Sequence, residues 1–371
     1  MKVCVFIPVI IPGESINGGV PKVFLNTVDA FLDAGHSVTC VVHHKSSALI
    51  KSLKERKVEK LEWLELDFEQ PTLNMDGGGL SKMKLAIKLF FLAFSICKLR
   101  LQIKQKFDIV LAHDITSTPY IISFRAPKKI VYLHSYRSFT NKIGRFFLYV
   151  SSLICKSYLS PTNDIAKEMQ SINSRIDVHV METPVLTNSI EVPVVKPGIG
   201  KLKLGYIGRL SPIKQLEEVI AFVESLISYN LNLELDIWGE PMDDVQRIYK
   251  SKISKLIKEK KLDKIIIFKG FCEDPVSTFR RYNYSILFSE GEAIPLSGLE
   301  SLMAGTPVIG TYVPGLIDLI GQEERGVYVP KNFKCDDLFF KRLTDKDFYM
   351  EDYVNRFTFK HWYNSFEKAI L

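Results

Sequence analysis

Short apolar runs alternate with amphipathic segments along most of the chain. The runs at 2–8, 37–42 and 107–112 predict buried strands, and the pattern from Pro21 to Ala34 predicts a helix that ends before a glycine. Strand, helix and strand in this order are typical of a parallel sheet with crossover helices. The first half of the chain therefore predicts an α/β domain.

A stretch rich in proline and glycine, from Thr183 to Gly200, interrupts this pattern and predicts a linker. The pattern then restarts, with predicted strands at 202–207, 233–238, 264–271 and 284–288. A chain of 371 residues is long for a single core. We therefore predict two domains, residues 1–195 and residues 196–354.

The predicted strand at 284–288 leads into a loop and a short helix. Ser297, followed three positions later by Glu300, matches a capping box, which predicts that the helix begins at Ser297. The free amides of Gly298 and its neighbours would point into the loop, where helix starts attract anions and phosphates above all. A second interpretation stays open, in which Glu300 only closes the capping box and Glu292 is a solvated loop charge.

A second candidate anion site follows the predicted strand at 202–207. Ser211 as N-cap and Pro212 as the first helical residue place Lys214 in the first turn of a helix. A cation there opposes the helix dipole, at a cost of a few tenths to about 1 kcal/mol, unless an anion lies between them. The alternative is a solvated lysine on an ordinary helix.

Histidines follow two predicted strands of the first half. His113 ends one of them, and ligands of open parallel sheets gather beyond the carboxyl ends of the strands. His113 is either an active-site residue or a structural hydrogen-bonding residue, and Asp114 is a candidate cap for the segment after it. His134, after the run at 129–133, is a weaker case of the same kind.

The loop after the first predicted strand contains Gly18 and Gly19. The three spaced glycines of the dinucleotide fingerprint are missing from this loop, which argues against an NAD enzyme. The two glycines either only make the turn or let the backbone lie close to a phosphate.

The loop and helix after residue 288 resemble a known nucleotide-sugar signature. Glu292 and Glu300 are separated by seven residues that include Pro295-Leu296, and Gly305-Thr306-Pro307 follows. This string resembles the signature of the retaining family 4 glycosyltransferases, the group 1 glycosyl transferases of GT-B fold. Where the family commonly has Gly-Phe-Gly-Leu-Pro, this chain has Ala-Ile-Pro-Leu-Ser from 293 to 297, which makes the identity of the sugar less readable.

Two further stretches resemble the same family. Gly208-Arg209-Leu210 with Lys214 is similar to its pyrophosphate clamp, and the run that ends in His113 is similar to a strand whose histidine lies beside the reacting sugar. The resemblance is strong from 202 to 330, fair at 107–114 and thin elsewhere in the first half.

The resemblance implies a fold of two Rossmann-like domains whose parallel sheets face a central cleft, with residues 355–371 crossing back to the first domain. It implies a nucleotide-sugar donor, with a UDP-sugar as the first expectation, and no metal ion or other cofactor. The catalytic residues would be Glu292, which faces the donor sugar, and His113. The residues that bind the donor would be Gly18, Gly19, Arg209, Lys214, Phe271, Pro295, Leu296, Ser297, Gly298 and Glu300.

By the same resemblance, each of these residues would bind a different part of the donor. Glu300 would take the ribose hydroxyls, and amides near Leu296 and Ser297 would hold the diphosphate. Arg209 and Lys214 would neutralise the charge of the departing nucleoside diphosphate without a metal. The turn at Phe271 would cradle the base, and Gly18 and Gly19 would lie close to the donor phosphates.

The expected reaction is retaining transfer of a hexosyl or N-acetylhexosaminyl group to a hydroxyl. Acceptors would be a cell-envelope glycan, a teichoic acid, an exopolysaccharide or a lipid-linked molecule, and no nucleic acid partner is expected. One alternative is a sugar-nucleotide epimerase or phosphorylase, since fold does not fix chemistry. The other is a non-catalytic scaffold that binds a membrane or a glycan. The paired glutamates disfavour both.

Charge and cysteine content indicate the kind of partner and the compartment to expect. A net charge of +7 and a pI near 8.9 favour an anionic partner. Six cysteines without paired spacing suit a reducing compartment, so we expect a cytoplasmic protein. The segment 80–106 has seven Lys and Arg residues, and its apolar run at 89–97 is too short to span a bilayer. It is either an interfacial helix on the anionic inner face of the plasma membrane or an ordinary sheet-covering helix with solvated lysines.

Overall fold

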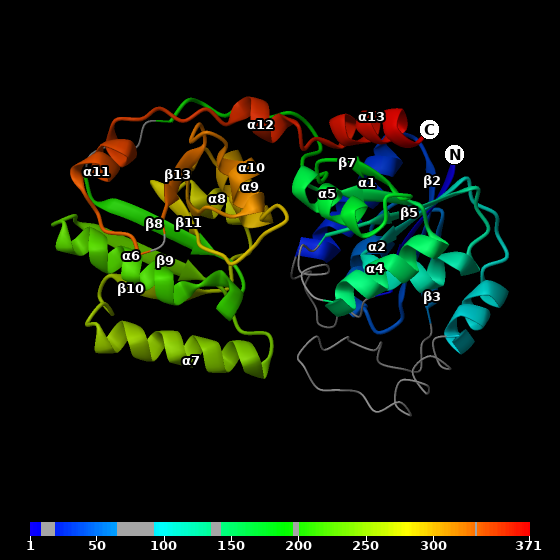
Figure 1. The fold of residues 1–371 in the computed structure, drawn as a ribbon, viewed down its shortest axis with the longest axis horizontal. Coiled ribbons are helices and arrows are strands. Elements are labelled where there is room, and N and C mark those ends of the chain that lie inside the picture. Colours follow the sequence, from blue (N-terminus) through cyan, green and yellow to red (C-terminus); the bar gives the residue numbers. More distant parts are fainter. Residues whose placement is uncertain (9–18, 65–92, 135–141, 196–199, 331) are drawn as a thin grey trace. The chain divides into compact units, whose positions relative to one another are not determined.

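The computed structural model describes residues 1–8, 19–64, 93–134, 142–195, 200–330 and 332–371. The chain divides into two compact units (Figure 1). The first consists of Met1–Asn188 with Phe357–Leu371, and the second is Ser189–Arg356. Each unit is built around one parallel sheet with helices, which confirms the predicted α/β class.

The sheet of the first unit has seven strands in the order β3-β2-β1-β4-β5-β6-β7. These strands are β1 (Lys2–Ile7), β2 (Ser37–His43), β3 (Lys60–Leu64), β4 (Ile109–His113), β5 (Lys128–Tyr132), β6 (Ser157–Ser160) and β7 (Asp177–Val180). Strand order reverses between β1 and β4. In parallel sheets of this kind, ligands bind beyond the carboxyl ends of the strands at such a switch point.

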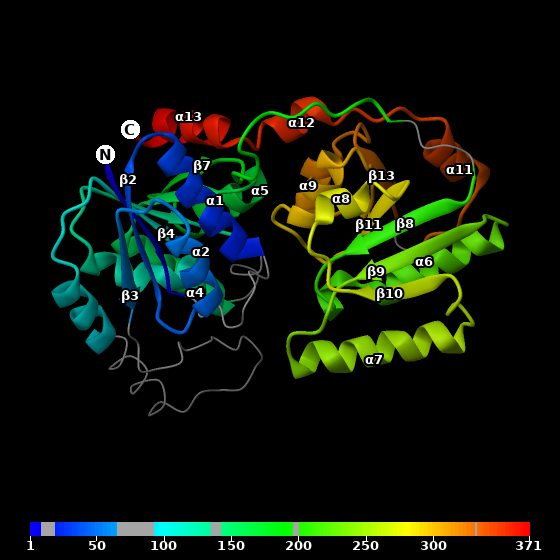
Figure 2. The same cartoon turned by 180° about the vertical axis from the view of Figure 1, so that it is seen from behind.

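Helices cover both faces of this sheet because right-handed crossovers lead away from the switch point in both directions. On one side the connections are α1 (Gly19–Asp33) and α2 (Ser47–Lys54), and on the other they are the 3₁₀ helix η1 (Ile115–Ser123), α4 (Lys142–Ile154) and α5 (Asn163–Ile172). A further helix, residues 93–102, precedes β4. Figure 2 shows α1 and α2 in front of the sheet.

The last helix, α13 (Phe359–Ile370), belongs to the first unit although it follows the whole second unit in sequence. It packs on α1, where the ring of Phe31 meets the rings of Trp362 and Phe366 edge-on at centroid distances of 5.3 and 5.2 Å. Trp362 and Phe366 are fully buried. The aromatic residues near the end of the chain therefore form a buried face of one helix.

The sheet of the second unit has six strands in the order β10-β9-β8-β11-β12-β13. They are β8 (Leu202–Ile207), β9 (Leu233–Trp238), β10 (Ile266–Gly270), β11 (Tyr284–Leu287), β12 (Val308–Thr311) and β13 (Gly326–Val329). Strand order reverses between β8 and β11, so the second switch point lies there. The predicted strands at 202–207 and 233–238 coincide with β8 and β9.

Right-handed crossovers again divide the helices between two faces. α6 (Leu216–Ser228) and α7 (Asp244–Glu259) follow β8 and β9, whereas α9 (Leu296–Met303) and α10 (Pro314–Ile320) follow β11 and β12. α7 and α9 lie on opposite sides of the sheet in both views (Figures 1 and 2). The short helices are η3 (Pro212–Lys214), α8 (Pro275–Phe279), α11 (Asp337–Thr344) and α12 (Glu351–Asn355).

Candidate functional site

Two loops meet at the switch point of the second sheet. The loop after β8 contains Arg209 and Lys214, and the loop after β11 contains Glu292. The carbonyl of Ile213 accepts hydrogen bonds from the amide of Glu290 at 3.1 Å and from the hydroxyl of Ser289 at 3.2 Å. These bonds tie the two loops together.

Lys214 and Glu292 form an ion pair between these loops. Each side chain is only 16% exposed, so the pair is largely withdrawn from water. Opposite charges attract more strongly there than at the surface, and removing one of them leaves the other without its partner. The structure thus brings together the predicted clamp lysine and the glutamate that is predicted to face the donor sugar.

Pro212 begins a helical turn that contains Lys214, as predicted, but the expectation that this turn belongs to a longer helix is wrong. Residues 212–214 form only the short turn η3, and the side chain of Ser211 does not cap it. Gln215 then adopts the left-handed conformation, with φ 47° and ψ 47°, which separates the turn from α6. The charge of Lys214 is therefore balanced by Glu292 and does not oppose the dipole of a long helix.

The predicted capping box at the start of α9 is also wrong. The helix begins at Leu296, after Pro295, and no side chain caps it. The carbonyl of Pro295 accepts a hydrogen bond from the amide of Gly298 at 3.0 Å, so that amide is not free. The amides of Leu296 and Ser297 donate to no other described residue. They are the amides of this helix start that remain available to an anion.

Glu300 lies on α9 close to the turn after β10. Burial is the main cause that raises the pKa of the Cys272 thiol in that turn. The negative charges of Glu300 and Asp274 raise it further. The neighbouring ring of Phe271 is 48% exposed. The predicted ribose-binding carboxylate and the aromatic residue predicted to lie at the base are therefore on neighbouring segments.

A glycine of α10 fixes the loop that contains Glu292. A Cβ atom at Gly315 would lie 2.7 Å from the carbonyl oxygen of Glu292, and it would also collide with the carbonyl of Ala293. Only glycine permits this approach of two backbone segments. Arg209, by contrast, is exposed and forms no ion pair with another described residue.

His113 ends β4, at the switch point of the first sheet. Its Nδ1 lies 2.8 Å from Nε2 of His134, and the two rings are nearly parallel, at 18°. Burial lowers the pKa of both histidines, that of His134 to about 3, so both are neutral at pH 7. Nε2 of His113 is buried and bonds to no described residue, which costs about 1–3 kcal/mol if it stays unpaired.

Asp114 caps the segment after β4, as its position predicts. Its side chain accepts a hydrogen bond from the amide of Ile115 at 2.6 Å, and burial raises the pKa of its carboxyl group. Its φ of 70° is unusual for a residue other than glycine, and such strain is frequent near functional sites.

Gly19 is the first residue of α1 and is exposed. Gly18 lies outside the described residues, as does the part of the predicted basic segment before residue 93.

Sequence reasoning underrated His134 and missed Gly315. β4 and β5 are neighbours in the sheet, with His113 opposite Tyr132, so the histidine that ends β4 and the histidine just after β5 meet in space. Their equivalent positions after two apolar runs were the available signal. Gly315 gave no signal, because its packing partner lies in a distant loop.

Comparison with known proteins assigns most of the second unit to a family. The family model described as "Glycosyl transferases group 1" matches residues 194–341. These residues belong to the glycosyl transferases group 1 family. The match includes both loops at the second switch point, and with them Arg209, Lys214, Glu292 and Glu300. We call residues 194–341 the group 1 domain below.

Two curated relatives each match a part of the chain that is about as long as the group 1 domain. Poly(ribitol-phosphate) alpha-N-acetylglucosaminyltransferase of Staphylococcus aureus (strain COL) is 26% identical over 141 residues, which are 38% of this chain and 27% of the relative. Poly(glycerol-phosphate) alpha-glucosyltransferase of Bacillus subtilis (strain 168) is 28% identical over 161 residues, 43% of this chain and 22% of the relative. The chain thus spans about a quarter of the length of these relatives.

Solved structures extend the likeness in fold to the whole chain. The structure of Anabaena HepE in complex with UDP and glucose has a TM-score of 0.67, with 12% identity, and covers 100% of this chain and 96% of that protein. At this identity the likeness concerns the fold. It confirms the predicted GT-B architecture of two Rossmann-like domains, each with a parallel sheet.

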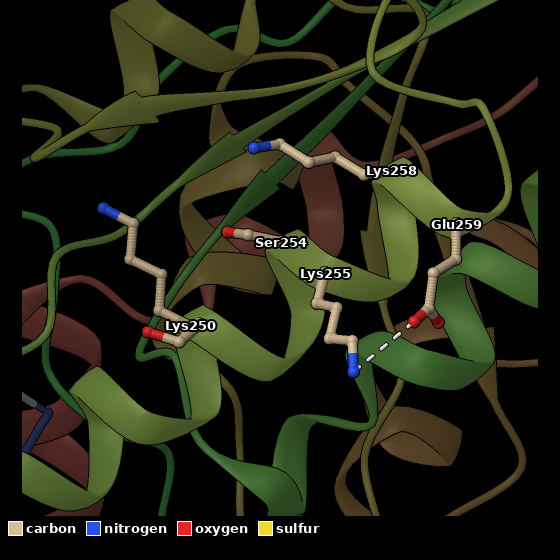
Figure 3. Close-up of a pocket in the computed structure, with 6 residues that line it drawn as sticks. Lys250, Ser254, Lys255, Lys258 and Glu259 are labelled. Atoms are coloured by element: carbon tan, nitrogen blue, oxygen red, sulfur yellow. Dashed lines mark ion pairs between the residues drawn. The ribbon is translucent and has the colours of Figure 1, made fainter.

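Two pockets, each within one unit, are lined by none of the predicted site residues. One runs along α7 in the group 1 domain, beside Lys250, Lys255 and Lys258 (Figure 3). Another lies at the amino ends of β5 and β6 in the first unit, beside Lys129 and Lys156.

In the part of the chain that the structure describes, no group of three or more His, Cys, Asp or Glu side chains is placed to hold a metal ion. Over the same residues, none of the helices has the length and apolar character needed to cross a bilayer.

Proposed function

We propose that the protein is a retaining glycosyltransferase that moves a sugar from a UDP-sugar to a hydroxyl of a cell-envelope polymer. The observation behind this proposal is the half-buried Lys214–Glu292 pair at the switch point of the group 1 domain. Its loops lie next to the amides of Leu296 and Ser297, which bond to no other described residue. Cations and amides at the carboxyl edge of a parallel sheet suit a diphosphate. The UDP bound to HepE supports the choice of nucleotide.

The donor-binding residues would act by charge and by hydrogen bonds. The amides of Leu296 and Ser297 would bind the diphosphate, and Arg209 and Lys214 would neutralise it. Glu300 would accept hydrogen bonds from the ribose, and Phe271 would contact the base. Such interactions stabilise the departing diphosphate as its charge grows.

In the proposed step, the bond between the anomeric carbon and the diphosphate oxygen breaks. A bond from the anomeric carbon to the acceptor oxygen forms on the same face, and the proton of the acceptor hydroxyl passes to the departing diphosphate. Glu292 and His113 would orient the sugar, because a carboxylate and a neutral imidazole both bind hydroxyl groups. The cations of the site make a metal ion unnecessary in this scheme.

A thermal-shift screen tests donor binding and the need for a metal. UDP, GDP, ADP, dTDP, CMP and their sugar conjugates are compared in magnesium and in EDTA. We expect UDP compounds to raise the melting temperature in both, because a ligand at 100 times its dissociation constant adds about 2.7 kcal/mol. Glu300→Ala should abolish the shift, whereas Glu218→Ala, at an exposed position on α6, should keep it. The absence of a shift with every nucleotide would contradict the proposal.

For the acceptor we propose a polyol-phosphate polymer of the teichoic acid type, because the names of both curated relatives specify such polymers. UDP release is measured with a poly(glycerol phosphate) oligomer and with a neutral glucan, and NMR of the product reads the anomeric configuration. Interconversion of the UDP-sugar without an acceptor would indicate an epimerase, and dependence on inorganic phosphate a phosphorylase. Donor binding without any transfer would favour a scaffold.

We also propose contact with an anionic membrane at the cytoplasmic face, through an apolar face of the first unit. The helix at 93–102 lies against η1, where Ser123 Oγ donates to the carbonyl of Ile96 at 2.9 Å, and η1 packs on α4. Among the side chains of these three elements that the structure describes, the exposed apolar ones are Phe94, Leu101, Ile122, Tyr149, Val150 and Leu153. Arg100 and Lys104 are exposed and lie close to Leu101 in sequence, and such cations are what an anionic lipid would require.

Vesicle flotation tests this contact. Vesicles of phosphatidylglycerol and phosphatidylcholine in equal amounts should bind the protein, and pure phosphatidylcholine should bind it less. Leu101→Glu, at a side chain 75% exposed, should lower the bound fraction, whereas Leu338→Glu, at one 68% exposed in the second unit, should not. Equal binding to both vesicle types would remove the anionic membrane from the proposal.

A further inference from the structure

The pocket at the amino ends of β5 and β6 has a cationic lining. We call it the amino-edge pocket; its volume is about 370 Å³. Among its described lining residues, three are lysines, Lys128, Lys129 and Lys156, and one is an acid, Asp177. The carboxylate of Asp177 lies 2.9 Å from Nε2 of His179, which also lines the pocket. Three lysines against one aspartate leave an excess of positive charge.

Lys129 is a half-buried cation in this lining. It forms no ion pair with another described residue. Burial, and then the positive charge of Arg100, lower the pKa of its ammonium group. Lys128 is held differently, because its Nζ donates a hydrogen bond to the carbonyl of Ile370 at 2.6 Å, which leaves its charge in place. A bound anion would give Lys129 the opposite charge that the described part of the protein does not provide.

The amino-edge pocket lies at the edge of the sheet opposite to the one where ligands of parallel sheets bind. β5 and β6 run from the pocket to that carboxyl edge. A strand rises roughly 3.3 Å per residue, so the five residues of β5 separate the two edges by about 16 Å. A ligand that reaches from one edge to the other must be an extended chain.

We propose that the amino-edge pocket binds a phosphate group of the polyol-phosphate acceptor, at a repeat other than the one that receives the sugar. Lys129 and Lys156 would bind the phosphate oxygens, and Asp177 would accept a hydrogen bond from a polyol hydroxyl. A second contact on the same chain raises the affinity for a long polymer without any change at the reacting repeat. The inference rests on the proposed function for the identity of the polymer, but binding to the pocket is measurable without sugar transfer.

The first test measures binding in the absence of a donor. A long poly(glycerol phosphate) oligomer is titrated into the protein by calorimetry in 0.15 M salt. Lys156→Glu should weaken binding about three- to tenfold, because the phosphate loses a cation and meets an anion. Lys54→Glu, at an exposed position on α2 outside the pocket, makes the same change of net charge and should weaken binding less than about twofold. Lys129→Gln should act in the same direction as Lys156→Glu.

Equal weakening by Lys156→Glu and Lys54→Glu would overturn the proposal, because net charge alone would then explain the attraction. No binding of the oligomer to the wild-type protein would overturn it as well. Melting temperatures of the three variants show whether each is folded.

His179 reports from inside the pocket. In protein with ¹³C-labelled histidine rings, both inorganic phosphate and the long oligomer should shift the His179 signal, which is assigned with His179→Gln. The signal of His361, at an exposed position on α13, should stay in place. A shift with soluble short-chain phosphatidylglycerol and none with the oligomer would overturn the proposal, because the pocket would then bind a lipid headgroup.

The second test compares acceptors of different length in the transfer reaction. We expect kcat/KM to be higher for the long oligomer than for one too short to reach both edges of the sheet. Lys156→Glu should remove most of this advantage, whereas Lys54→Glu should keep it. An advantage that survives in Lys156→Glu and Lys129→Gln would show that the pocket does not hold the acceptor. If no transfer is found with any acceptor, the proposed function fails, and the calorimetry still decides whether the pocket binds a phosphate polymer.

Discussion

Lys214 and Glu292 differ from the surface ion pairs of the protein in their burial. Lys255 and Glu259 form an ion pair on α7 (Figure 3). They are 79% and 58% exposed, and exposed pairs of this kind contribute about 0–1 kcal/mol. Lys214 and Glu292 are each 16% exposed. A charge left alone in the latter environment must find a new partner, and a diphosphate is one such partner for the lysine.

We therefore expect Lys214→Ala to weaken binding of the UDP-sugar at least about tenfold, since the diphosphate loses a partly desolvated cation. Glu292→Gln should instead lower kcat more than donor affinity, because it keeps the shape of the site but changes the contact with the sugar. Isothermal titration and steady-state kinetics separate the two effects. Lys255→Ala is the control and should change neither. Unchanged donor affinity in Lys214→Ala would remove this lysine from the proposed clamp.

The lowered pKa values of the buried histidines predict how stability depends on pH. An unfolded histidine titrates near pH 6.5, and burial holds the pKa of folded His134 at about 3. Between these values the unfolded chain binds the additional proton, so stability falls as pH falls, by at most about 1.4 kcal/mol per pH unit for one histidine. Asp114 acts in the opposite direction near pH 4 and above, because its pKa is raised.

Urea unfolding at pH 7, 6 and 5 measures this dependence. The stability of the first unit should decrease over this range, and His134→Gln should make the decrease smaller, since it removes one of the titrating groups. His361→Gln, at an exposed histidine on α13, controls for the substitution itself. A His134→Gln slope equal to that of the wild type would mean that the folded histidine is not held neutral.

At the scale of elements, the position of α10 controls the loop that contains Glu292. Gly315→Ala places a methyl group against the carbonyls of Glu292 and Ala293, which belong to the backbone and cannot rotate away. Overpacking of this kind costs about 1–3 kcal/mol, and here it also moves a functional loop. We expect a lower melting temperature and a fall of about tenfold in donor affinity.

Gly200→Ala is the matched control, because a Cβ atom there meets nothing within 4 Å. It should change neither melting temperature nor donor affinity. If Gly315→Ala lowered stability while leaving donor affinity intact, the loop would not need this contact to hold the donor.

The elements show which features local pattern predicts. Strands β8 and β9 were predicted to the residue, because a buried strand between polar turns is a local signal. The starts of α9 and α6 were not. At the start of α9 the Gly298 amide bonds to the carbonyl of Pro295, and the expected capping box does not form. Before α6 the turn ends at Gln215, which is left-handed although it is not a glycine, so the sequence contains no signal for this end.

The contacts within the site were beyond local pattern. Lys214 and Glu292 are 78 positions apart, and each was predicted separately as a donor-binding residue. Their ion pair depends on the order of strands in the sheet, which places the loops after β8 and β11 side by side. The same holds for His113 and His134, which meet because β4 and β5 are neighbours. The motifs therefore identified the individual site residues, whereas the order of strands in each sheet determined which of them come into contact.

Over the whole molecule, the positive charge belongs to the first unit. That unit contains 26 Lys and Arg against 17 Asp and Glu, a net charge of +9, and the second contains 23 against 25, a net charge of −2. The proposed donor site lies in the unit that is close to neutral. We propose that the first unit receives the acceptor, and it is this unit that attracts a polyanion at long range.

This division predicts that salt acts on the acceptor more than on the donor. The screening length falls from about 30 Å at 0.01 M salt to about 8 Å at 0.15 M, so long-range attraction by the first unit fades while short contacts in the donor site persist. We expect kcat/KM for a poly(glycerol phosphate) acceptor to fall about tenfold or more over this range. Donor affinity and turnover with a neutral glucan should change less than about twofold.

Charge reversal at single positions locates the effect. Lys104→Glu, at an exposed site in the first unit, should reduce kcat/KM for the polyanionic acceptor at low salt, and the difference from wild type should shrink as salt rises. Lys258→Glu, at an exposed site on α7, makes the same change of charge in the second unit and should have little effect. If the two variants responded alike, net charge alone would govern the rate. Equal salt sensitivity of the polyanionic and neutral acceptors would instead exclude long-range attraction of the acceptor, because a neutral polymer has no charge for the first unit to attract.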